Sequence, residues 1–341
     1  MTPGLRVLEP GLHTTVQDLG RIGYQDIGVP VSGALDAFSL RLANALVGNR
    51  QGMAALEILG SGPTLETAVD TARVALAGPG AGLVVGERSI GAGQSITLTR
   101  GAVFRVLVGH QSVCCYLAVE GGIAVPLVLG SASTCARAAI GGIEGRLLRR
   151  DDVVPLGIMR APERPEVRLA RPPATERDQP IRVILGPQQE YFTDDAVAAL
   201  LGAEFRVSES SDRMGMRLDG PPLHHRLGWD IASDAIATGA IQVPGSAQPI
   251  LLLADHQTTG GYPKIATVVS ADLPIVGRRQ PNDVLRFVPV SIEEAEQLCR
   301  QQECQLAELI ATFEPVPDSG RIDLISLYDY NLISGVVSGL E

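Results

Sequence analysis

The sequence predicts a mainly β protein made of two related halves with a few short helices. Its 341 residues exceed what one ordinary hydrophobic core holds, so we expect two domains. The 38 glycines and 23 prolines, together with short apolar runs between glycine turns, are typical of a turn-rich β protein. Three sequence markers also recur in the same order in both halves, which favours an internal duplication.

Each half carries the same three markers. They are a first strand, an apolar strand that ends in an acid followed later by Gly-Gly, and a closing segment. In the first half they lie at residues 72–79, 113–122 and 148–155, and in the second half at residues 181–187, 250–261 and 278–289. The preserved order favours duplication over the chance recurrence of sequence patterns that are common in β-strands.

The remaining elements follow from capping residues and periodicity. Asp36 can cap a helix that Gly48 would end, and Thr193 can cap a short helix that runs to about residue 201. Ser291 with Glu294 makes a capping box for a helix to about residue 310. Residues 54–108 alternate short apolar runs with glycine turns, which predicts several short strands.

The chain divides at a proline-rich segment. Residues 160–180 hold five prolines and many charges, which predicts a linker. We therefore place a first β-barrel half at residues 1–165, a linker at 166–180 and a second half with a C-terminal helix and tail at 181–341. The tail at residues 322–337 is more apolar than a disordered end.

Composition excludes several classes of protein. A net charge of −10 argues against binding to nucleic acid or to anionic membranes. The N-terminal residues lack the apolar core of a signal peptide, and no run of 18 apolar residues predicts a membrane span. The five cysteines form no C-x-x-C pair, which indicates reduced, mostly buried thiols and a cytoplasmic location.

Common catalytic and ligand-binding motifs are missing. There is no P-loop, no H-E-x-x-H spacing and no G-x-S-x-G elbow. The turns at residues 78–80 and 91–93 lie in a β context with no helix clearly following, so they are weak candidates for binding phosphate. His224 and His225 follow two prolines and indicate a surface loop, and we predict no metal site.

The polar turn at residues 255–261 is the strongest candidate site. It follows the apolar run at residues 250–253 and places an acid, an imidazole, an amide and two hydroxyls beside Gly260 and Gly261. Histidine has an ordinary pKa near neutrality, so His256 could act as a general base, although the spacing alone favours a hydrogen-bonded loop histidine. Lys264, the single lysine of the sequence, follows after Tyr262 and Pro263.

Two arginines form a second candidate. Arg213 and Arg217 are four residues apart with a glycine between them. If this segment is extended, both side chains point to one face and can bind a carboxylate or carbonyl oxygen. The alternative is a strand with salt bridges to Asp212 and Asp219.

Three long segments of the sequence resemble one known family. The segments at residues 11–49, 210–223 and 254–287 resemble the biotin-dependent carboxyltransferase family, also called allophanate hydrolase subunit 2 or KipA. Its members include the C subunit of the ATP-hydrolysing 5-oxoprolinase of bacteria, and a homologous region lies in urea carboxylase. The resemblance spans nearly the whole chain, and residues 254–263 are more similar to the stand-alone bacterial protein.

The resemblance implies a fold and partners. The fold would be two β-barrel halves of cyclophilin-like type. The partner would be a KipI-like protein, allophanate hydrolase subunit 1, with the active site at or near their contact. Because the chain lacks a Met-Lys-Met biotinylation motif, any biotin would arrive on another protein.

The activity implied first is ATP-dependent opening of the lactam of pyroglutamate to glutamate, within a complex. A lactam is a poor electrophile, so its oxygen needs stabilising donors. We assign Lys264, His256 and Gln257 as catalytic, and Thr258, Gly260, Gly261, Arg213 and Arg217 as substrate-binding, with Arg213 on the substrate carboxylate. ATP would bind in the complex, since this chain has no P-loop.

Two alternatives stay open. One is urea-carboxylase-type transfer on a small amide, with a biotinylated partner. The other is a non-catalytic regulator of a KipI-like kinase inhibitor. A neighbouring gene for the YcsF-like A subunit of 5-oxoprolinase would favour the lactam reaction, whereas a sporulation context would favour regulation.

The geometric expectation is that Lys264 and Arg213 face one open cleft. Buried polar groups without partners cost about 1–3 kcal/mol each, so a turn this polar is expected to line a cleft rather than a core. Alanine at Lys264 or Arg213 is then expected to leave the protein folded and complex-forming and to lower turnover at least tenfold, which corresponds to about 1.4 kcal/mol in barrier.

Overall fold

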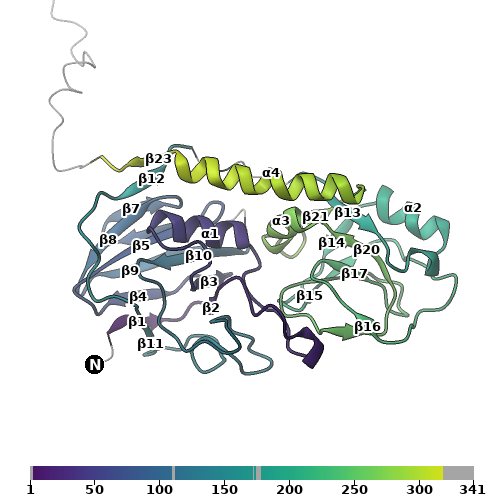
Figure 1. Cartoon of the computed structure of the whole chain (residues 1–341), viewed down its shortest axis with the longest axis horizontal. Coiled ribbons are helices and arrows are strands. Elements are labelled where there is room, and N and C mark those ends of the chain that lie inside the picture. Colours follow the sequence, from purple (N-terminus) through teal and green to yellow (C-terminus); the bar gives the residue numbers. More distant parts are fainter. Residues whose placement is uncertain (1–2, 110–111, 172, 174–177, 318–341) are drawn as a thin grey trace, which may run out of the picture.

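Two packed sheets form the first half of the molecule (Figure 1). The computed structural model describes residues 3–109, 112–171, 173 and 178–317. The first sheet has the order β11 (Val153–Pro155), β1 (Gly4–Glu9), β4 (Thr64–Thr67), β9 (Val103–Leu107), β6 (Gly82–Val85) and β7 (Arg88–Gly91). The second has the order β2 (His13–Gln17), β3 (Ala55–Leu59), β10 (Cys114–Val119), β5 (Thr71–Ala77) and β8 (Ser95–Thr99).

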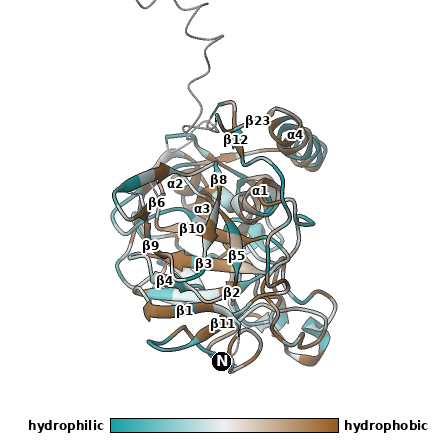
Figure 2. Cartoon of the chain, turned by 90° about the vertical axis from the view of Figure 1, so that its left-hand side faces the viewer, coloured by the Kyte–Doolittle hydropathy of each residue, from teal (hydrophilic) through white to brown (hydrophobic). Residues whose placement is uncertain are grey.

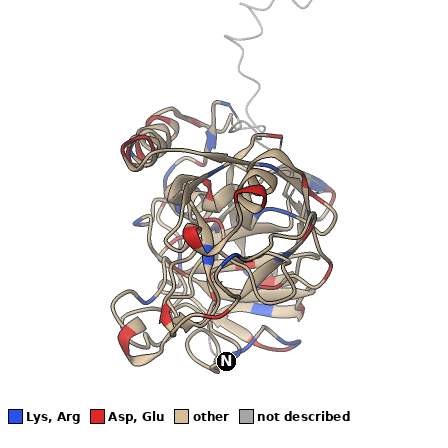
Figure 3. Cartoon of the chain, turned by 90° about the vertical axis from the view of Figure 1, so that its right-hand side faces the viewer, with Lys and Arg blue, Asp and Glu red and all other residues tan. Residues whose placement is uncertain are grey.

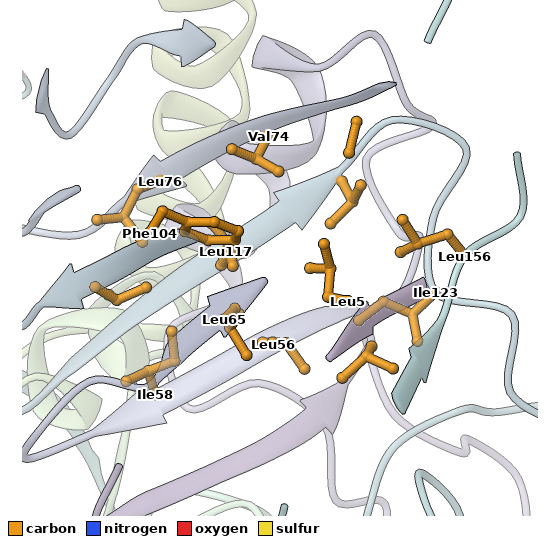
Figure 4. Packing of buried hydrophobic residues seen from close by; sticks show 14 of the residues in the cluster. Leu5, Leu56, Ile58, Leu65, Val74, Leu76, Phe104, Leu117, Ile123 and Leu156 are labelled. Carbon is orange, nitrogen blue, oxygen red and sulfur yellow. The ribbon is translucent and has the colours of Figure 1, made fainter. Parts of the chain in front are cut away.

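The first hydrophobic core lies between these two sheets (Figure 4). Leu5, Leu65 and Phe104 reach it from one sheet, and Leu56 and Leu117 from the other. Every residue of strand β10 is buried, and its alternate residues pack in two different clusters on its opposite faces. This geometry sends Cys115 into the core and Cys114 towards helix α1 (Ala37–Leu46), as expected for adjacent cysteines in a strand.

One eight-stranded sheet forms the second half. Its order is β21 (Val284–Leu285), β14 (Phe205–Val207), β15 (Gly215–Asp219), β18 (Ile250–Leu252), β17 (Ala240–Gln242), β20 (Lys264–Val268), β13 (Ile181–Leu185) and β22 (Phe287–Pro289). A second core, with Phe205, Leu251 and Phe287 among its members, fills this half. The predicted class, a mainly β fold of barrel type with a few short helices, is confirmed.

The three recurring markers do not occupy equivalent strands, so that detail of the repeat was wrong. In the first half β5 pairs directly with β10. In the second half β13 pairs with β20, and both β20 and β17 lie between β13 and β18. The recurring sequence segments therefore reflect the strands and glycine turns that both halves contain. They do not mark strands at equivalent positions in the two sheets.

The helices begin where their caps predict. The Asp36 side chain accepts from the Ser39 N–H at 2.9 Å at the start of α1, and Thr193 caps α2 (Asp194–Gly202) in the same way. Ser291 and Glu294 form both bonds of the capping box of α4 (Ile292–Ala311). The shorter helices are α3 (Leu273–Gly277), η1 (Gln25–Ile27), η2 (Gln189–Tyr191) and η3 (Ser270–Asp272).

Helix α4 lies along both halves (Figure 1). Leu306 packs in the cluster around α1, whereas Ala295 packs beside Val269 and Ala271 of the second half. Figure 2 shows hydrophilic and hydrophobic residues together on this helix, and Figure 3 shows acidic residues along it. A helix with one narrow apolar stripe is suited to this bridging position.

The segment predicted as a linker is partly structured. Strand β12 (Val167–Leu169) pairs with β23 (Phe313–Pro315), which follows α4. The proposed domain boundaries stay a prediction. Helix α4 contacts α1 of the first half and β13 and η3 of the second, while β23 pairs with β12 inside the predicted linker. The apolar tail at residues 322–337 lies outside the described residues. No helix in the described ranges has the length and apolarity needed to cross a membrane.

Candidate functional site

The polar turn at residues 255–261 lies against the segment 234–238. Strand β16 (Asp234–Ala235) pairs antiparallel with β19 (Thr259–Gly260), with Asp234 opposite Gly260. The pairing continues in register, because the Ile236 N–H donates to the Thr258 carbonyl at 3.0 Å. Farther along, Thr238 meets His256. This covering segment buries several of the polar groups that the sequence placed in an open cleft.

Lys264 lies at the start of β20 and is 2% exposed. Its Nζ donates to Asp234 Oδ2 at 2.6 Å and to the Ala235 carbonyl at 3.0 Å. The Asp234 side chain remains about half exposed and also accepts from the Gln188 amide at 3.2 Å. The bond from Lys264 is the main reason that the pKa of Asp234 lies below its ordinary value. The ammonium group is thus buried beneath one carboxylate that water can reach.

His256 is also buried, and both of its ring nitrogens have partners. Nδ1 lies 2.6 Å from the Gln257 carbonyl oxygen, and Nε2 lies 3.1 Å from Thr238 Oγ1. Burial lowers the pKa of the imidazole, while the bond to the Gln257 carbonyl and the charge of Asp255 oppose this effect. The ring is therefore held neutral at physiological pH, which a general base requires.

The other predicted residues of the turn have different surroundings. Gln257 is exposed, and its amide nitrogen lies 3.4 Å from Gln242 Oε1. Thr258 is buried and bonds to the covering segment through its carbonyl. A Cβ added to Gly260 would lie 2.7 Å from Ile236 Cδ1, whereas one added to Gly261 would first meet the Ile231 carbonyl at 3.4 Å. Close packing against the covering segment therefore explains Gly260.

Arg213 is not available to bind a substrate carboxylate, which corrects its predicted role. Its guanidinium is buried, donates to both oxygens of Asp255 at 2.8 and 3.1 Å, and donates to the Gly33 carbonyl at 2.7 Å. Its Nη1 also pairs with Glu57 of β3. Burial opposes its charge, but the carboxylates of Glu57 and Asp255 raise the pKa of Arg213 above its ordinary value.

Arg217 does not share a face with Arg213. Strand β15 begins only at Gly215, so the alternation of faces cannot be counted back to Arg213. Arg217 is exposed on β15, while Arg213 lies before it and points inward. The alternative salt bridges to Asp212 and Asp219 are also wrong for Arg213, because its partners are Glu57 and Asp255.

Arg213 belongs to a polar network between the two halves. The Tyr116 hydroxyl of β10 donates to Glu57 Oε2 at 2.6 Å and accepts from the Asp36 N–H at 2.8 Å. Asp36 in turn accepts from Arg278 Nε at 2.6 Å. Burial and the nearby carboxylates raise the pKa of Tyr116 well above its usual value. These groups join residues of the first half to residues of the second.

The histidines at 224 and 225 and the glycine turn at 78–80 lie outside the polar turn. His224 is exposed, and His225 Nε2 lies 3.0 Å from the Val243 carbonyl. Among the described residues, no group of three or more His, Cys, Asp or Glu side chains is placed to hold a metal ion. The turn at residues 78–80 leads into strand β6 rather than a helix, and it lines a cavity of about 520 Å³ that α1 and Arg278 also line.

Sequence reasoning missed Glu57, Tyr116, Asp234 and Thr238. Glu57 carried a signal, because it is the single acid in the apolar strand at residues 55–59. An acid at such a position needs a buried cationic or hydrogen-bonding partner. Asp234 and Thr238 carried none, since they precede the turn by about 20 residues and only the tertiary pairing brings them to it.

Known proteins resemble this chain in sequence and in fold. It is 35% identical over 305 residues to the 5-oxoprolinase C subunit of Escherichia coli, covering 89% of this chain and 97% of that protein. It is 34% identical to the urea amidolyase of Lachancea kluyveri over 89% of this chain, but covers 18% of that protein. The crystal structure of the K. lactis urea amidolyase matches 91% of this chain and 20% of its own length, with a TM-score of 0.83 and 31% identity.

Fold and sequence together define the class as a mainly β carboxyltransferase domain. The family model for the carboxyltransferase domain, subdomains A and B, matches residues 27–289. The chain belongs to this family. The matched residues include both the polar turn and the polar network around Arg213.

Proposed function

We propose that this chain is the C subunit of a cytoplasmic, ATP-hydrolysing 5-oxoprolinase that opens pyroglutamate to glutamate. The observation that carries the proposal is its 35% identity to the 5-oxoprolinase C subunit of Escherichia coli across nearly the whole of both chains. The chain would act only in a complex with a KipI-like protein and a YcsF-like protein, the latter as the A subunit. It would thus be one part of an ATP-dependent amidohydrolase.

The polar turn is the proposed reaction centre. Lactam opening places negative charge on the carbonyl oxygen, and a buried ammonium stabilises such charge more strongly than one in water. Lys264 is such a group, with the half-exposed Asp234 as its present counter-charge. Gln257, Thr258 and the main chain of Gly260 and Gly261 are proposed as further contacts, and His256 as the base.

ATP is proposed to bind elsewhere in the complex. Its phosphates need a cradle of main-chain N–H groups, commonly a glycine loop that opens a helix. Here the Gly78 turn continues into β6, and a Cβ on Gly78 would lie 2.7 Å from the Cβ of Cys115. We therefore assign no reaction step that involves ATP to residues of this chain.

Reconstitution tests the proposal. The three proposed subunits are expressed together, with and without this chain, and ATP-dependent formation of glutamate from 5-oxoproline is measured. The proposal predicts activity only when this chain is present. Equal activity in complexes that lack the chain would overturn it.

A second candidate is carboxyl transfer to a small amide or urea, favoured by the TM-score of 0.83 with the K. lactis urea amidolyase. That reaction would need bicarbonate and a biotinylated partner protein. Avidin separates the two candidates, since it would abolish carboxyl transfer and leave lactam opening unchanged.

A further inference from the structure

Thr238 of the covering segment and His256 of the polar turn form a hydrogen-bonded pair. The distance from Thr238 Oγ1 to His256 Nε2 is 3.1 Å, and His256 Nδ1 lies 2.6 Å from the Gln257 carbonyl oxygen. Three groups therefore stand in a row: a hydroxyl, an imidazole and a carbonyl that orients it. A nucleophile or relay group, a base and an orienting acceptor share this arrangement in hydrolytic enzymes.

The direction of the hydrogen bonds follows from the chemistry of the partners. A main-chain carbonyl only accepts, so Nδ1 of His256 carries the hydrogen. In the neutral ring Nε2 is then unprotonated, and the hydroxyl hydrogen of Thr238 points to it. The lone pairs of Thr238 Oγ1 face away from the ring and can accept a proton.

Exposure separates the roles of the two side chains. His256 is 2% exposed, whereas Thr238 is partly exposed. A base buried this deeply cannot contact a substrate directly, but the threonine beside it is partly exposed. Asp234 lies four residues before Thr238 on the same segment, so their Cα atoms are at most about 14 Å apart.

We propose that Thr238 is a catalytic residue that relays a proton between the reacting water and His256. This inference rests on the proposed lactam-opening function. As a water oxygen bonds to the carbonyl carbon, one water proton moves to Thr238 Oγ1 and the original Thr238 hydrogen moves to His256 Nε2. The carbonyl π electrons move to its oxygen.

Collapse of this tetrahedral species completes the reaction. The carbon–oxygen double bond re-forms, the ring carbon–nitrogen bond breaks, and the nitrogen takes a proton back from Nε2 through Thr238. One water has then been added across the amide, and His256 is neutral again. ATP, proposed to bind elsewhere in the complex, takes no part in these proton transfers. Asp255, the charged residue next to His256, stabilises the transient imidazolium, although its carboxylate is already bonded to Arg213.

The activity test compares Thr238→Val with Thr238→Ser in the reconstituted complex. Thr238→Val is expected to lower kcat at least tenfold and change KM less than about twofold, whereas Thr238→Ser keeps most activity. His256→Gln should lower kcat similarly, and the double variant should be no worse than the poorer single variant, since the two act as a unit. Thr99→Val, at an exposed position on β8, is the matched control. Wild-type kcat in Thr238→Val, or additive losses in the double variant, would overturn the relay.

A second readout does not depend on turnover. Nitrogen NMR of the five histidines in the isolated full chain, assigned with His256→Gln, reports which ring nitrogen carries the proton. We expect His256 with the hydrogen on Nδ1, and an Nε2 signal that shifts in Thr238→Val and is kept in Thr238→Ser. A hydrogen on Nε2 would overturn the relay even in an active complex. A wild-type complex without lactam turnover would count against the proposed function, and the NMR result would still decide the geometry of the pair.

Discussion

Arg213 and Lys264 are both buried cations, yet their surroundings differ. Arg213 pairs with Glu57, which is fully buried, and with Asp255, whose side chain is 9% exposed. Lys264 pairs with Asp234, whose side chain is 49% exposed. Arg213 lies between the two halves of the molecule. Lys264 lies beneath the covering segment, next to the polar turn.

This difference separates a structural role from a chemical one. When both partners of an ion pair are buried, loss of one leaves an uncompensated charge in a medium of low dielectric constant. When one partner can be hydrated, the pair can open and exchange that partner for a ligand at small cost. Arg213 therefore joins the two halves, while Lys264 is proposed to stabilise a developing negative charge.

The largest expected effect is the loss of stability in Arg213→Met. Removal of this guanidinium leaves Glu57 and Asp255 buried without their cation, and we expect the free energy of unfolding to fall by about 3–5 kcal/mol. This reverses the expectation that a substitution at Arg213 leaves the protein folded. Denaturant unfolding measures the change, and Arg217→Met, at an exposed position, should shift it by less than about 0.5 kcal/mol. Equal small shifts in both variants would remove the distinction between the two regions.

A smaller loss is expected for Tyr116→Phe. This change removes the hydroxyl that donates to Glu57 and accepts from the Asp36 N–H, while it keeps the packing of the ring against α1. The unpaired groups should lower the free energy of unfolding by about 1–3 kcal/mol. Tyr24→Phe, in the turn-rich N-terminal loop, is the control. A Tyr116→Phe protein as stable as the wild type would show that the network does not depend on this hydroxyl.

The smallest effect on stability is expected for Lys264→Met. Asp234 can be hydrated once its partner is gone, so the free energy of unfolding at neutral pH should fall by less than it does in Tyr116→Phe. The pKa of the Asp234 carboxyl should rise towards its ordinary value of 3.8, and an NMR titration measures this.

The sign of the pH dependence follows from that pKa. Lys264 lowers the folded-state pKa of Asp234, so its contribution to stability is present above pH 3.8 and is lost as the pH falls through the folded-state value. The wild type should therefore lose more stability than Lys264→Met on acidification from neutral pH. Parallel stability curves for the two proteins would mean that the pair is not formed in solution.

Much of the fold could be predicted because its signals are local. Asp36, Thr193 and Ser291 begin helices through bonds within one turn, and alternating residues placed Cys114 and Cys115 on opposite faces of β10. The strand order could not be predicted in the same way. The partner of β13 is chosen by the packing of the second core, and the recurring sequence words carry no information on that choice.

The position of the site along the chain stays a prediction, whereas the geometry expected for it differs from that in the structure. Residues 255–264 do gather imidazole, amide and ammonium groups, as their composition indicated. Their burial depends on the segment 234–238, and the fate of Arg213 depends on Glu57, 156 residues away. No local pattern encodes either contact, so the polar turn was expected to be more open than it is.

Turnover of the reconstituted complex with Lys264→Met is the most direct test of the role proposed for Lys264 in the polar turn. ATP-dependent formation of glutamate from 5-oxoproline is measured beside the folded fraction and the assembly of the complex. We predict a folded, assembled complex whose turnover is at least tenfold lower than that of the wild type, about 1.4 kcal/mol in barrier. Wild-type turnover in the Lys264→Met complex would contradict it and would place the chemistry away from the polar turn.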